Sequence, residues 1–216
     1  MVLAVVKTMK NPRSAVLKTS VMACTDVFNA FGNLISSASG EAFDRLLLQL
    51  LLKASQDKRF VCEEAEKAMR AMATSMPPLP LLRKLKAYVH HANLRVRAKA
   101  AVAMAHCAAR MEIGTMREFG LSALLQVSAE LLNDRLPEAR EAARSIVSSI
   151  HAAFCKEAAL KEEKKEEKEQ EKEEEKVKEQ GEVSAVAAAW ESLCALSLSP
   201  ISALAVAKIV SQSQPQ

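Results

Sequence analysis

Four stretches of the chain share one pattern of small or apolar residues, and this pattern constrains the fold more than any other feature. Each stretch begins at an anchor residue and has further small or apolar side chains 4, 7, 8 and 11 residues later. The four anchors are Val16, Val61, Val96 and Ala139. These offsets bring the side chains to one face of a helix, because a helix turns once every 3.6 residues or so. We therefore predict four amphipathic helices of the same kind.

The spacing of the anchors indicates how the helices are arranged. Consecutive anchors lie 45, 35 and 43 residues apart, which is typical of HEAT and armadillo repeats. A second helical pattern lies between them, at residues 43–52, 79–89 and 116–132. The small side chains at offsets 4 and 7 would let stacked helices approach closely. With only 5 glycines in 216 residues, the chain is predicted to be all-α, a right-handed α-solenoid of HEAT/armadillo-like helix pairs.

Residues with catalytic or metal-binding chemistry are sparse. Cys24 and Cys107 fall on the apolar stripe, which predicts buried thiols and not nucleophiles. His151 and Cys155 share a helix face, but two ligands do not make a metal site. Phosphate-binding glycine motifs and a nucleophile elbow are both absent from the sequence. We expect no enzyme, no cofactor, no metal and no small-molecule substrate.

Three segments of different composition divide the chain. Residues 1–155 hold the repeats and carry a net charge of +8, since the whole chain carries +4 and the other segments carry −4 and zero. Residues 156–182 contain 8 Lys and 12 Glu, which predicts a solvated spacer, helical or partly disordered, without the apolar stripe of a coiled coil. Residues 183–216 are apolar again but are interrupted by Pro200, so we expect a tail of two short helices and no membrane span. This tail is expected to dock on a partner or on the exposed end of the solenoid.

The start of the chain and its cysteines lead to two further expectations. The apolar run Met1–Met9 stands where a solenoid normally has a polar capping face, so we expect repeats that would precede it to be missing. No cleavage site follows Met1, and the five cysteines are odd in number and far apart. These features indicate a reduced, intracellular compartment.

The loop before each anchored helix is polar and basic. Each loop has an Asn or Asp two residues before an Arg: Asn11 and Arg13, Asp57 and Arg59, Asn93 and Arg95, Asn133 and Arg135. Helix capping explains the Asn and Asp. It does not explain Arg at the start of a helix, where the dipole disfavours a cation by some tenths of a kcal/mol. The pattern therefore favours a basic binding ridge along one edge of the array.

Three of these segments resemble the TOG domains of CLASP and crescerin proteins. They are Met9–Val16, Ser55–Ala65 and Asn93–Lys99, and the resemblance extends over residues 1 to about 155. TOG domains bind αβ-tubulin through their intra-repeat loops, so the resemblance implies tubulin as the partner. The tubulin-binding residues that it implies, together with the rest of the ridge, are Lys10, Asn11, Arg13, Lys58, Arg59, Phe60, Asn93, Arg95, Arg97, Lys99 and Arg135. A full TOG domain has six repeats and often a Trp anchor in its first loop; here the only Trp is Trp190, so weaker binding is expected.

The leading hypothesis is a TOG-like protein that binds tubulin or microtubules and regulates their dynamics in the cytoplasm. A basic ridge suits the acidic surface of tubulin. One alternative is a generic HEAT/armadillo scaffold that binds an unrelated protein through another surface or through its tail. Nucleic acid as the partner is not expected, because basic and aromatic residues are not interleaved.

Overall fold

The chain is all-α, as the repeat pattern predicts. The structure is a computed structural model that describes residues 2–37, 40–169 and 179–213, and these residues form eleven helices and no strand. In chain order the helices are α1 (Val2–Thr8), α2 (Ser14–Ser37), α3 (Glu41–Ala54), α4 (Arg59–Ser75), α5 (Pro78–Lys86), α6 (Leu94–Ala108), α7 (Ile113–Phe119), α8 (Leu121–Leu132), α9 (Pro137–Glu169), α10 (Glu179–Ser197) and α11 (Pro200–Ser213).

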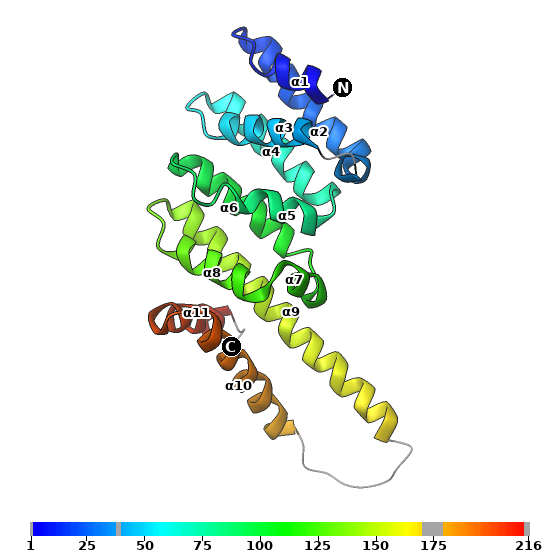
Figure 1. The fold of residues 1–216 in the computed structure, drawn as a ribbon, viewed down its shortest axis with the longest axis vertical. Coiled ribbons are helices and arrows are strands. Elements are labelled where there is room, and N and C mark those ends of the chain that lie inside the picture. The colour runs from blue at the N-terminus through cyan, green and yellow to red at the C-terminus, as the bar shows by residue number, and fades with distance from the viewer. Residues whose placement is uncertain (1, 38–39, 170–178, 214–216) are drawn as a thin grey trace.

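The helices stack in pairs along the long axis of the molecule and form an α-solenoid (Figure 1). The second helix of each pair packs on the second helix of the next, in the order α2, α4, α6, α9 and α11. First helices pack in the same way, α1 on α3 and α8 on α10. Because each pair touches mainly its neighbours, the loops between paired helices lie in a row along one edge.

The small residues of the stripe are buried between second helices. Ala65 and Ala68 of α4, Ala100 of α6 and Ala143 of α9 are all fully buried. The short side chains let the helix backbones approach closely, which the sequence pattern predicts. The first stretch differs, because Val16 is only half-buried and Leu17 is buried in its place.

Glycines mark two positions where the helices depart from the simple pattern. Gly32 follows a kink at Phe31, and a Cβ on Gly32 would lie 2.5–2.8 Å from atoms of Ser75 in α4. Gly120 has φ 103°, a conformation that other residues rarely adopt, and it separates α7 from α8. The single helical pattern expected at residues 116–132 is therefore wrong: the chain turns at Gly120 and forms two helices.

The C-terminal helices pack on the last pair of the array. Helix α9 runs without interruption from the array into the charged segment, and α10 and α11 return to pack against α8 and α9 (Figure 1). Trp190 of α10 is buried and meets the rings of His151 and Phe154 edge-on, with centroids 5.0 and 5.7 Å away. Residues 170–178 of the predicted spacer lie outside the described residues. Among the described helices, none combines the length and hydropathy needed to span a bilayer.

Candidate protein-binding edge

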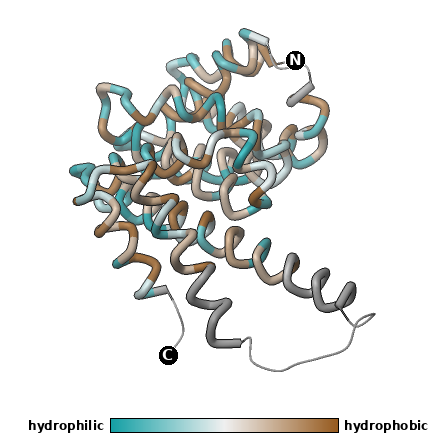
Figure 2. The backbone as a smooth tube through the Cα atoms, turned by 60° about the horizontal axis from the view of Figure 1, so that its bottom comes forward, coloured by the Kyte–Doolittle hydropathy of each residue, from teal (hydrophilic) through white to brown (hydrophobic). Residues whose placement is uncertain are grey.

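Four loops lie in a row on one side of the solenoid, along the left of Figure 1. They are residues 9–13, 55–58, 87–93 and 133–136, and we call them the loop edge. Each loop joins the two helices of one pair, so the stacking of pairs fixes the position of each loop relative to the next. Much of their backbone is teal, the hydrophilic end of the scale, in Figure 2.

Short polar turns shape three of the loops. The Asn11 side-chain oxygen accepts a hydrogen bond from the Arg13 backbone N–H at 2.9 Å, and Asn93 accepts one from Arg95 at the same distance. Both turns satisfy an N–H at the start of a helix, as a capping residue does. In the fourth loop the turn is one residue later than the spacing of Asn133 and Arg135 suggests, because Asp134 accepts from Leu136.

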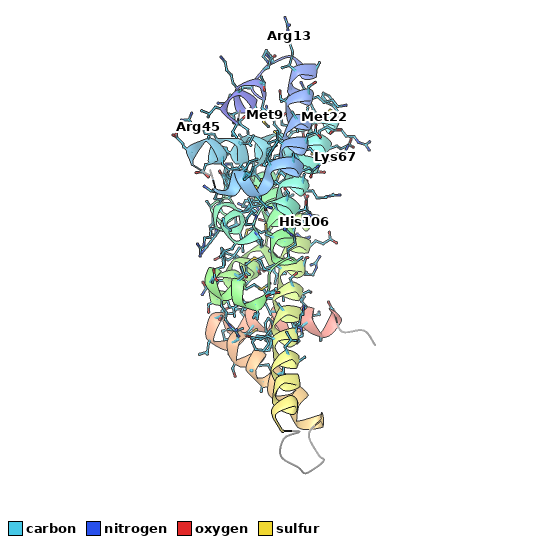
Figure 3. All side chains as sticks on the ribbon, turned by 90° about the vertical axis from the view of Figure 1, so that its right-hand side faces the viewer. Met9, Arg13, Met22, Arg45, Lys67 and His106 are labelled. Carbon is cyan, nitrogen blue, oxygen red and sulfur yellow. The ribbon has the colours of Figure 1, made fainter. Side chains whose placement is uncertain are left out.

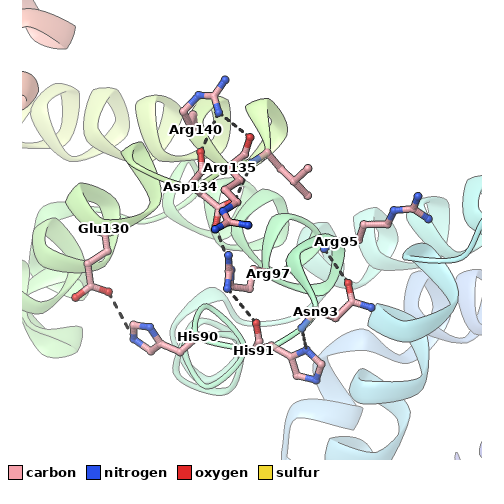
Figure 4. Close-up of polar contacts among 10 residues, drawn as sticks. His90, His91, Asn93, Arg95, Arg97, Glu130, Asp134, Arg135 and Arg140 are labelled. Atoms are coloured by element: carbon pink, nitrogen blue, oxygen red, sulfur yellow. Dashed lines mark hydrogen bonds and ion pairs between the residues drawn. The ribbon is translucent and has the colours of Figure 1, made fainter.

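Arg97 lies in an internal ion pair that joins two loops. Its Nε is 3.0 Å from Oδ2 of Asp134, and the same guanidinium donates to the His91 carbonyl oxygen at 3.3 Å (Figure 4). The Arg97 side chain is 23% exposed and that of Asp134 only 6%. Arg140 donates to the carbonyl oxygens of Asp134 and Arg135 from the opposite side. These contacts hold the loops at residues 87–93 and 133–136 together.

Lys99 bridges the second helices of three consecutive pairs. Its Nζ lies 2.6 Å from a carboxylate oxygen of Glu66 in α4 and 2.6 Å from one of Glu138 in α9, and the lysine side chain is 14% exposed. Burial alone would lower the pKa of Lys99, but the hydrogen bonds that its ammonium donates to the two carboxylates raise it. Burial would likewise raise the pKa of Glu66, but its hydrogen bond to Lys99 lowers it. The ammonium therefore stays charged and bound within the array.

Arg95 and Arg59 are exposed but have acidic neighbours. Arg95 pairs with Asp57 of the preceding loop and also donates to the Ser55 carbonyl oxygen at 3.4 Å. Arg59 pairs with Glu63 one helical turn away, at 2.7 Å. Surface pairs of this kind contribute little stability, typically up to about 1 kcal/mol, and can exchange for a partner's carboxylate.

The remaining cations of the loop edge point into solvent. Within the described residues no ion pair is found for four exposed basic residues. They are Lys10, Arg13, Lys58 and Arg135. Figure 3 shows Arg13 at the tip of the array, pointing away from it. Phe60 is also exposed, next to Arg59. The edge thus presents unpaired cations from three loops and, at the start of α4, one exposed aromatic ring.

The structure separates the predicted ridge into two groups of residues. Exposed side chains that a partner could reach are Lys10, Arg13, Lys58, Arg59, Phe60, Arg95 and Arg135. Asn11, Asn93, Arg97 and Lys99 instead make the contacts that shape and join the loops. The acidic partners of this second group, Asp134, Glu66 and Glu138, are absent from the sequence-based set, because they lie far away along the chain.

The cysteines of the array show no sign of activation. Burial raises the pKa of Cys24 and of Cys107 to about 12, so both are thiols at neutral pH. In the part of the chain that the structure describes, no group of three His, Cys, Asp or Glu side chains could hold a metal ion.

Comparisons with known proteins find distant structural similarity and no family. No protein-family model and no curated protein matches the chain. Among solved structures, an engineered protein from the Northeast Structural Genomics Consortium is 18% identical, with a TM-score of 0.41 over 71% of this chain and 65% of that one. The designed armadillo repeat protein YIII(Dq)4CqI is 14% identical, with a TM-score of 0.39 over 97% of this chain and 100% of that one. At these identities and TM-scores neither structure informs the function of this chain.

Proposed function

We propose that this α-solenoid is a protein-binding scaffold whose loop edge binds an acidic protein surface, and that the partner is tubulin or the microtubule. The observation that carries the proposal is the row of exposed cations on the loop edge, supplied by successive helix pairs. The resemblance of three segments to TOG domains is what names tubulin. Such a protein would act on microtubule dynamics in the cytoplasm.

Recognition would depend on loops that are held in place before the partner arrives. Arg97 and Lys99 tie successive pairs together through Asp134, Glu66 and Glu138. A preorganised surface loses less conformational entropy on binding, so more of the interaction energy appears as affinity. Lys10, Arg13, Lys58, Arg59 and Arg135 would then pair with carboxylates of the partner.

Phe60 is the aromatic residue best placed to contact the partner. It is exposed at the start of α4, directly after Lys58 and Arg59. Aromatic side chains surrounded by polar contacts contribute a large share of the binding energy in many interfaces. We assign Phe60 the role of an apolar contact within a basic surface.

Charge reversal at the loop edge tests the proposal. Arg13→Glu combined with Lys58→Glu changes the net charge by four without removing an ion pair among the described residues. The control, Arg45→Glu with Lys67→Glu, makes the same change of net charge at exposed cations away from the loop edge (Figure 3). It also removes the surface ion pairs with Glu41 and Glu64, which contribute at most about 1 kcal/mol each. Affinity for αβ-tubulin is measured by biolayer interferometry at low salt, after circular dichroism has shown equal helicity.

The two variants should behave differently. We expect the loop-edge variant to bind at least tenfold more weakly than the wild type, and the control to lose less than threefold. An equal loss in both variants would show that only net charge matters and would refute the assignment of the loop edge. Failure of the wild-type chain to bind would refute tubulin as the partner.

A further inference from the structure

The outer face of α10 and α11 exposes large aliphatic side chains. Leu196, Ile201 and Leu204 are 88%, 82% and 73% exposed. Trp190 and Val206, on the opposite sides of these helices, are buried against the array. The only charged residues between 183 and 213 are Glu191 and Lys208. An apolar surface of this kind on a helix pair marks an interaction site.

The opposite end of the solenoid has an apolar groove. It lies between α1 and α2, has a volume of about 480 Å³, and is lined by uncharged side chains, none larger than valine. Ala4 and Thr8 of α1 line one side, and Ala15, Thr19 and Ala23 of α2 line the other. The groove therefore has room for side chains larger than those that line it.

These two surfaces correspond to the two sides of a junction between neighbouring helix pairs, such as the one between α1–α2 and α3–α4. Second helices stack on second helices along the whole array, and first helices stack on first helices at its two ends, α1 on α3 and α8 on α10. The exposed side of α10 and α11 is the side on which a further pair would stack. The exposed side of α1 and α2 is the side that a helix pair turns toward the pair before it. Figure 1 shows the two pairs at opposite ends of the long axis.

We propose that a second copy of this chain stacks the groove between its α1 and α2 on the α10–α11 face, head to tail. Ile201 and Leu204 then enter the groove of the second copy, where alanine and threonine side chains leave space for them. Protruding aliphatics at one end and a small-residue groove at the other fit each other better than either surface fits a copy of itself.

A contact of this kind has a consequence for assembly. The two surfaces in contact are different, so each dimer keeps one free groove and one free aliphatic face. Further copies then add in the same direction, and the size of the assembly rises with protein concentration. This inference is independent of tubulin, because both surfaces lie outside the loop edge.

Two end variants of the full chain test the proposal by sedimentation velocity. The groove variant is Ala15→Glu with Thr19→Glu, and the face variant is Ile201→Glu with Leu204→Glu. All four residues are exposed, so folding should survive; helicity and the fluorescence of Trp190 check this. Ile201→Gln with Leu204→Gln repeats the face variant without added charge.

The wild type should sediment faster as its concentration rises, and each variant alone should stay monomeric. An equimolar mixture of the two variants should form a dimer and nothing larger, because only one intact groove and one intact face remain. A wild type that stays monomeric up to about 100 µM would overturn the proposal, since its Kd would then exceed about 100 µM. Dimers formed by the groove variant alone, or a mixture that stays monomeric, would also overturn it.

Discussion

Replacing Lys99 by methionine tests whether this lysine holds the array together. The substitution keeps an unbranched side chain that is one atom shorter and removes the ammonium group. Glu66 and Glu138 then face each other without the cation that both contact at 2.6 Å. Since the sequence places Lys99 among the binding residues and the structure places it between three helices, the two roles predict different results.

The size of the effect follows from the exposure of the three side chains. Removing one partner of a fully buried ion pair costs about 3–5 kcal/mol, and an exposed pair contributes up to about 1 kcal/mol. Lys99 is 14% exposed, but Glu66 and Glu138 are 39% and 42% exposed, so water partly solvates the carboxylates left behind. We therefore expect Lys99→Met to lower the free energy of unfolding by about 2 kcal/mol.

Urea denaturation followed by circular dichroism measures this change. With a slope of about 2 kcal/mol per molar urea, the midpoint should fall by about 1 M. Adding Glu66→Gln and Glu138→Gln to Lys99→Met should restore more than half of the loss, because the repulsion disappears. Lys58→Met, at an exposed position of the loop edge, is the control and should leave the midpoint unchanged. A midpoint for Lys99→Met equal to that of the wild type would refute the structural role.

Three further predictions concern the packing of the helices. Gly32→Ala should lower the free energy of unfolding by about 1–3 kcal/mol in the same urea assay, because the added methyl group would meet side-chain and backbone atoms of Ser75. A variant as stable as the wild type would show that α2 and α4 are farther apart. Trp190→Ala should weaken the docking of α10 on the array by about 3–5 kcal/mol. Hydrogen exchange in α10 and α11 should become faster, and unchanged exchange would contradict the packing described. Burial lowers the pKa of His151 from 6.5, so protonation opposes folding: the stability is complete above pH 6.5 and is lost as the pH falls toward the folded-state pKa. His151→Gln should therefore flatten the dependence of the urea midpoint on pH between 6.5 and 5, and an equally steep dependence would count against this burial.

The sequence pattern predicts the helix pairs well because the signal is local. Small residues such as Ala65 and Ala100 recur at the offsets of one helix face, and they are buried where second helices meet. A break inside a helical pattern is harder to predict. The helical pattern of residues 116–132 continues across Gly120. The positive φ of Gly120, seen only in the structure, divides the expected helix into α7 and α8.

The roles of individual charged residues could not be predicted in the same way. Arg97 stands at the first turn of a helix, where the sequence suggests an exposed cation. Its partner Asp134 lies 37 residues away, and only the stacking of the loops brings the two together. Lys99 is similar, because Glu66 and Glu138 belong to the helices on either side of it. Residues whose contacts are local, such as Arg13 with Asn11, lie where the pattern suggests.

Size-exclusion chromatography of the full chain with αβ-tubulin, at about 50 mM and about 200 mM salt, tests the central claim most directly. An interaction made by exposed cations is screened by salt, because the Debye length is only about 10 Å at 0.1 M. The account predicts a co-migrating peak at the lower salt concentration that weakens at the higher one. Separate elution of the two proteins at the lower salt concentration, or a complex that does not respond to salt, would contradict binding through the loop edge.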